Sequence, residues 1–159
     1  LWIRRAVREY GVNFVGFCAG AFIAVGPEAQ GSAIAPDTGF SLLSQESLPY
    51  YHLEDEGIEY AMVGLRFANS SVRSVLWWGG PSLPEVPHGV IARYEDTDQA
   101  AIIQADTGKG MIFLSGPHPE APESWREKLG LHDPDGLDQD LAWQMIEAAL
   151  SGTRLPTLK

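Results

Sequence analysis

Apolar residues in the first part of the chain follow helical spacing and then form short uninterrupted runs. Ile3, Val7 and Tyr10 recur at helical spacing with arginines between them, which predicts a short amphipathic helix that ends at Gly11. Residues 12–17 are mostly apolar and do not alternate, which is typical of a strand covered on both faces of a parallel sheet. The small and apolar residues at 19–25 predict a second, buried helix.

The later pattern predicts mainly strands. Residues 58–67, 72–78 and 90–94 are rich in β-forming residues and are bounded by turn residues. Residues 100–104 and 111–115 flank Asp-Thr-Gly-Lys-Gly, which predicts a hairpin. Asp138 is expected to cap a final helix with Leu141, Met145, Ala148 and Leu150 on its apolar face. Residues 28–56 are predicted to be loops with one short strand.

Composition narrows the choice of class and partners. The 159 residues are 45% hydrophobic, which indicates one folded domain over residues 1–159. The net charge of −10, with no basic stripe, argues against nucleic acid as a partner. Residues 10–27 carry no charge, but their glycines and lack of leucine favour a buried strand, turn and helix over a signal peptide or membrane span. We therefore expect no membrane partner.

Potential metal ligands are sparse. One cysteine, Cys18, excludes an intrachain disulfide and a thiolate-rich metal site, and it suggests a reducing, cytoplasmic compartment. His52, His88 and His132 show no metal-ligand spacing. The sequence therefore predicts neither a metal nor a cofactor.

The sharpest local motif is Gly-Phe-Cys-Ala-Gly at 16–20, between the buried strand and the small-residue helix. It has the form of a nucleophile elbow, in which flanking glycines allow a tight strand-to-helix turn. The helix N-terminus would favour the thiolate of Cys18. The alternative is a structural cysteine in a glycine-rich contact between strand and helix.

A second motif, Gly-Pro-His-Pro-Glu at 116–120, directly follows the strand at 111–115. A thiol nucleophile needs a base, and the imidazole of that base needs a carboxylate to orient it. His118 and Glu120 lie two apart in an extended segment, so they can point the same way. The alternative is an exposed, proline-rich turn. Gly79 and Gly80, which follow two tryptophans, either line a pocket or form a tight turn.

Taken together, the motifs resemble class I glutamine amidotransferase-like domains, in which a Gly-x-Cys-x-Gly elbow precedes His-x-Glu by about a hundred residues. The residues at 16–24, 77–81, 108–110 and 115–120 look more closely like the biotin-protein ligase N-terminal-like branch. The resemblance implies a flavodoxin-like three-layer α/β/α sandwich. It also implies Cys18 as nucleophile, His118 as base and Glu120 as the orienting acid, with the Ala19 amide as one oxyanion donor.

Two features differ from the family pattern. Phe22 stands where glutamine-hydrolysing members usually have Gln, so glutamine is not implied as the substrate. About a dozen residues precede the elbow strand, whereas family members have several strands there. We therefore expect N-terminal strands to come from a companion chain or from a part of the gene product outside this sequence.

The favoured function is a Cys-His-Glu hydrolase or amidotransferase-like protein that acts on a small-molecule amide or related acyl substrate through a thioester. The alternative is a non-catalytic binding or regulatory domain that keeps the same residues without turnover.

Overall fold

The computed structural model describes residues 2–26, 39–44 and 47–158. In these residues the helices are α1 (Trp2–Tyr10), α2 (Ala19–Val25), α3 (Glu123–Leu129) and α4 (Gln139–Ser151). The strands are β1 (Phe14–Phe17), β2 (Tyr60–Phe67), β3 (Val72–Trp78), β4 (Val90–Tyr94), β5 (Ala100–Thr107) and β6 (Gly110–Ser115).

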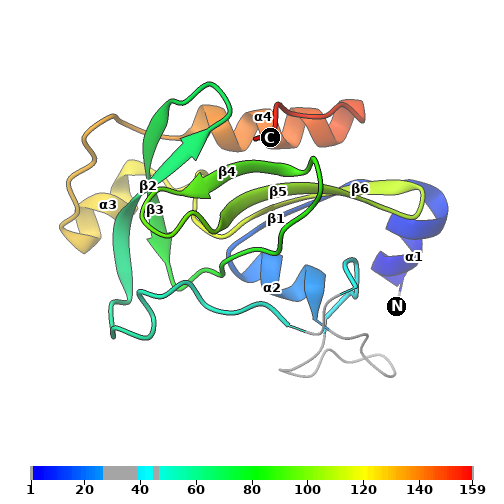
Figure 1. The fold of residues 1–159 in the computed structure, drawn as a ribbon, viewed down its shortest axis with the longest axis horizontal. Helices are drawn as coiled ribbons and strands as arrows, with labels where there is room; N and C mark the ends of the chain where they lie inside the picture. Colours follow the sequence, from blue (N-terminus) through cyan, green and yellow to red (C-terminus); the bar gives the residue numbers. More distant parts are fainter. Residues whose placement is uncertain (1, 27–38, 45–46, 159) are drawn as a thin grey trace.

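Within the described residues, the strands form one six-stranded sheet in the order β1-β6-β5-β4-β2-β3 (Figure 1). Of the strand pairs that the structure describes, only β1 and β6 run parallel, with Gly16 opposite Leu114. All the other neighbouring strands are antiparallel. Hairpins join β2 to β3 and β5 to β6, where Thr107 pairs with Gly110.

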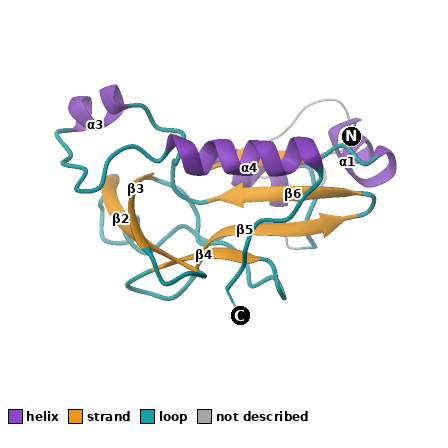
Figure 2. Ribbon diagram, turned by 90° about the horizontal axis from the view of Figure 1, so that it is seen from above, coloured by secondary structure: helices purple, strands orange, loops and turns teal. Residues whose placement is uncertain are grey.

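The two faces of the sheet are covered by different helices. Figure 1 shows α2 below the sheet and α4 above it, and Figure 2 shows α1 and α3 near opposite ends of α4. Side chains of β6 alternate accordingly: Ile112 and Leu114 join the core that contains α2, and Phe113 joins the core that contains α4. Because both faces are buried, the apolar residues of this strand form an uninterrupted run.

The sheet curls, and the ends of its two edge strands come close together. Residues at the end of β1 contact the last residue of β3, because Cys18 Sγ lies 3.3 Å from the Trp78 carbonyl oxygen. The segment after β6 is also tied to β3 by a 2.7 Å hydrogen bond from His118 N–H to the Leu76 carbonyl. The curled sheet forms a half-barrel, and its curl brings the ends of β1, β6 and β3 close together.

The predicted flavodoxin-like three-layer sandwich is therefore wrong. That fold needs parallel strands joined by crossover helices. Here most neighbouring strands are antiparallel and are joined by hairpins. The apolar run at 12–17 was assigned to a parallel sheet, and β1 does pair in parallel with β6. The extension of that pattern to the whole sheet was wrong, because a curled antiparallel sheet also buries both of its faces.

Several local predictions are confirmed. The hairpin between β5 and β6 forms. Asp138 occupies the N-cap position of α4, but its side chain makes no cap hydrogen bond, so the predicted side-chain cap does not form. Leu141, Met145 and Ala148 of α4 are buried, but Leu150 is 79% exposed, so its assignment to the apolar face was wrong. Helix α3 was not predicted. In the predicted loop at 28–56, residues 28–38 and 45–46 lie outside the described part of the chain, and Tyr50 forms an isolated bridge with Pro81.

In the part of the chain that the structure describes, no helix combines the length and apolar character needed to cross a membrane.

Candidate functional site

Cys18 lies in a sharp turn between β1 and α2. Its backbone has φ 47° and ψ −106°, a region that costs a non-glycine residue about 1–3 kcal/mol. Gly16 makes the turn possible, because a Cβ there would lie 2.7 Å from the backbone carbon and oxygen of Gly20. This strained, close-packed geometry is that of a nucleophile elbow.

The thiol of Cys18 is partly exposed and faces the end of β3. Its Sγ donates a 3.3 Å hydrogen bond to the Trp78 carbonyl. Its backbone N–H donates to the Ser115 carbonyl of β6 at 2.8 Å, so the turn is tied to both neighbouring strand ends. The Cys18 carbonyl accepts from the amides of Ala21 and Phe22 and so begins α2.

His118 and Glu120 form the pair that their spacing predicts. His118 Nδ1 and Glu120 Oε1 are 2.7 Å apart, and the side chains are 13% and 33% exposed. The second carboxylate oxygen, Oε2, is buried and has no hydrogen-bond partner among the described residues. A carboxylate at Nδ1 leaves Nε2 as the nitrogen available to a nucleophile.

The His118 ring also interacts with the Cys18 thiol. Burial lowers the pKa of His118, but hydrogen bonds to Cys18 and Glu120 outweigh burial and raise this pKa to about 9. The imidazole is therefore protonated at neutral pH, which suits a partner that stabilises a thiolate and then protonates a leaving group. The structure thus brings Cys18, His118 and Glu120 together, while their catalytic roles stay predictions.

A buried arginine holds the segment that carries His118 and Glu120. Arg126 of α3 is 3% exposed and donates from Nη1 to the Ala121 carbonyl at 2.8 Å. Its other nitrogens reach Asp133 at 2.6 Å and Asp138 at 3.1 Å. Burial raises the pKa of Asp138 to about 6, against the opposing effect of Arg73 and Arg126. The Asp138 carboxylate accepts hydrogen bonds from Arg73 and Arg126, and it makes no side-chain cap hydrogen bond to α4.

The residues predicted to line the pocket lie next to Cys18. Ala19 is the first residue of α2, where a helix leaves N–H groups without intrahelical partners. Gly79 and Gly80 follow Trp78 directly, and a Cβ on Gly80 would lie 2.0 Å from the Gly116 carbonyl oxygen. The Gly80 carbonyl accepts from Trp77 Nε1 at 2.9 Å, so this segment also forms a tight turn. Both interpretations of these glycines are compatible with the structure.

Among the described residues, no three His, Cys, Asp or Glu side chains lie close enough together to hold a metal ion. His52 instead bridges Glu56 at 2.8 Å and Asp96 at 2.9 Å, and these hydrogen bonds raise the pKa of His52. Asp96 also accepts from the Tyr51 hydroxyl. This cluster anchors the segment before β2 to the turn after β4.

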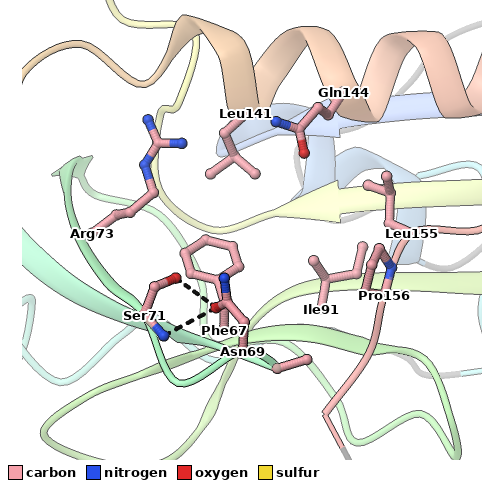
Figure 3. Close-up of a pocket in the computed structure, with 10 residues that line it drawn as sticks. Phe67, Asn69, Ser71, Arg73, Ile91, Leu141, Gln144, Leu155 and Pro156 are labelled. Atoms are coloured by element: carbon pink, nitrogen blue, oxygen red, sulfur yellow. Dashed lines mark hydrogen bonds between the residues drawn. The ribbon is translucent and has the colours of Figure 1, made fainter.

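A separate cavity of about 270 Å³ lies between the β2–β3 turn, β4, α4 and the segment near residue 155. Figure 3 shows Arg73 and Gln144 at this cavity and the hydrogen bonds from Ser71 to Asn69. None of the predicted site residues lines it.

Sequence reasoning missed Trp125 of α3, whose ring lies 5.5 Å from the His118 ring between centroids. The signal was present, because Pro122 followed by Glu123 is typical of the first residues of a helix. The short length of α3 hid it from a search for helical periodicity.

No family model matches the chain. The chain is 28% identical over 136 residues to a biotin–protein ligase of Schizosaccharomyces pombe. This match covers 69% of the chain but only 20% of the ligase. The chain is therefore distantly related to a biotin–protein ligase and spans about a fifth of that protein's length. The comparison gives no support for a hydrolase, and the wider amidotransferase-like assignment does not follow from it.

Proposed function

We propose that this chain carries a cysteine-dependent acyl-transfer site, built from Cys18, His118 and Glu120, that acts on an amide or related acyl substrate. The observation that carries the proposal is the position of Cys18 in a strained turn beside a His118–Glu120 pair. Strain of this kind persists only where the surrounding structure imposes it, and it is concentrated at functional sites. Neither a structural cysteine nor a solvated histidine requires this arrangement.

In the proposed reaction, the Cys18 thiolate attacks the substrate carbonyl carbon and forms a tetrahedral intermediate. The Ala19 amide donates to the developing oxyanion. Protonated His118 then gives its proton to the leaving amine, the carbon–nitrogen bond breaks, and a thioester remains on Cys18. Neutral His118 next takes a proton from water as the water attacks the thioester, which releases the acid and regenerates the thiolate. Glu120 orients the imidazole throughout.

The distant relationship to a biotin–protein ligase supplies no further step. The matched region is a fifth of the ligase, so biotin ligation is not part of the proposal.

Acylation of Cys18 by activated esters and anilides tests the proposed function. Intact-mass spectrometry should show one acyl group on the wild-type protein and none on Cys18→Ala. Turnover of the same compounds should fall by about 10²–10⁴ in His118→Ala, the usual contribution of a general acid–base group. His132→Ala, which changes an exposed histidine, is the matched control.

A wild-type protein whose Cys18 is alkylated rapidly by iodoacetamide, but is never acylated, would contradict the proposal. That result would instead indicate a non-catalytic binding domain.

A further inference from the structure

A row of aromatic rings leads away from His118 along the rim of the site. The Trp125 ring lies edge-on to His118 at 5.5 Å, and the Trp78 ring lies edge-on to Trp125 at 5.8 Å. Tyr60 continues the row at 6.2 Å from Trp78. These rings come from α3, β3 and β2, so the curl of the sheet assembles them.

These rings differ from the aromatic residues of the core. Trp77 is fully buried and its Nε1 donates to the Gly80 carbonyl, whereas the adjacent Trp78 is 37% exposed. Trp77 is placed by the core, in which it is buried. Trp78 is partly in contact with water, so burial in the core does not explain its position. Exposed aromatic surface beside a reactive group is typical of a binding surface, because it supplies large apolar area with few rotatable bonds.

Charge near the site favours an uncharged group over an anionic one. A Cβ on Gly79 would lie 3.9 Å from the Glu54 carboxylate, so this acidic side chain borders the segment that carries Trp78. The whole chain has a net charge of −10. Glu54 and the net charge would repel a carboxylate on the part of the substrate that lies near Trp78, whereas the positive charge of His118 lies at the reacting group.

We propose that Trp78 and Trp125 bind the variable part of the substrate, and that this part is a flat, uncharged aromatic group next to the acyl carbon. This inference rests on the proposed function for the identity of the reacting group. Offset or edge-to-face contact with such rings contributes about 0.5–1.5 kcal/mol beyond burial.

Alkylation of Cys18 by two reagents with the same reactive group tests this inference without requiring turnover. Iodoacetamide and N-(1-naphthyl)iodoacetamide are compared under second-order conditions, and each rate is divided by its rate with glutathione. In the wild type, the corrected rate constant for the naphthyl reagent should exceed that for iodoacetamide by a factor of about 3–10. Trp78→Ala should return this ratio to about one.

Trp143→Ala is the matched control, because Trp143 lies on α4 and is 58% exposed. The corrected ratio of Trp143→Ala should equal that of the wild type. If Trp78→Ala does not fold, Trp78→Leu keeps an apolar side chain and removes the ring, and the same fall in ratio is expected.

A corrected ratio of one in the wild type, or an equal loss in Trp143→Ala, would overturn the inference. So would a higher ratio for a carboxylate-bearing analogue than for the naphthyl reagent. Because the proposed function is tested by acylation and its dependence on His118, failure of that function leaves a distinct signature: a high naphthyl ratio without any acyl-enzyme.

Discussion

Gly16→Ala tests whether the close-packed turn around Cys18 determines both stability and thiol reactivity. The added methyl group would lie 2.7 Å from the backbone carbon and oxygen of Gly20 and 2.9 Å from Phe14 Cε1. Backbone at the start of a helix cannot move aside as a flexible side chain can. Such overpacking costs about 1–3 kcal/mol, so the free energy of unfolding should fall by that amount.

Gly20→Ala is the matched control within the same turn. A Cβ at Gly20 would meet no atom within 4 Å, and Gly20 lies inside α2. Replacing a helical glycine by alanine stabilises by roughly 0.5–1 kcal/mol. The two variants should therefore differ by roughly 1.5–4 kcal/mol, in opposite directions from the wild type.

Urea denaturation measures the free energies of unfolding of the two variants. The rate of alkylation by iodoacetamide measures the reactivity of Cys18 in the turn. We expect slower alkylation of Cys18 in Gly16→Ala, because the turn must open to admit the methyl group. Gly20→Ala should be alkylated at close to the wild-type rate. Equal stabilities for the two variants, or normal alkylation in a folded Gly16→Ala protein, would refute the reasoning.

Three further predictions concern the residues that support the site. Arg126→Met should lower the free energy of unfolding by about 3 kcal/mol, the lower end of the range for breaking a buried ion pair, because Asp133 and the buried Asp138 both lose this partner while Asp138 keeps Arg73. Arg154→Met, at an exposed ion pair, should cost at most about 1 kcal/mol, and a similar cost for both in urea denaturation would contradict this account. Glu120→Gln should fold normally but show slower Cys18 alkylation, because an amide stabilises the imidazolium less; an unchanged rate would argue against an orienting role. His118 has its pKa raised from 6.5 to about 9, so its contribution to stability is full below pH 6.5 and is lost as pH rises through 9. The difference in stability between wild type and His118→Ala should shrink over that window, and a difference that grows with pH would have the wrong sign.

The local chemistry was more predictable than the architecture. A Gly-x-Cys-x-Gly turn is specified by short-range sterics, and His118 and Glu120 meet because they are two residues apart in an extended segment. The β5–β6 hairpin follows from its turn residues in the same way. These features depend on neighbouring residues alone.

The strand directions and the curl of the sheet could not be predicted from local turn and spacing patterns. Runs such as residues 111–115 are apolar because both faces are covered, and coverage says nothing of strand direction. The short link at Asn69-Ser70-Ser71 was the better evidence, because a turn of this length joins antiparallel strands. The contacts of Trp78 with Cys18 and Trp125 depend on the curl that follows, so no local pattern indicated them.

The measurement that tests the central claim most directly is the pH dependence of Cys18 alkylation in the wild type and in His118→Ala. Iodoacetamide reacts with the thiolate. If His118 and Cys18 act as a pair, alkylation in the wild type depends on the protonation of His118, whose pKa is raised to about 9, and His118→Ala is alkylated more slowly at neutral pH and with a different pH profile. Identical rates and pH profiles for the two proteins would contradict the account.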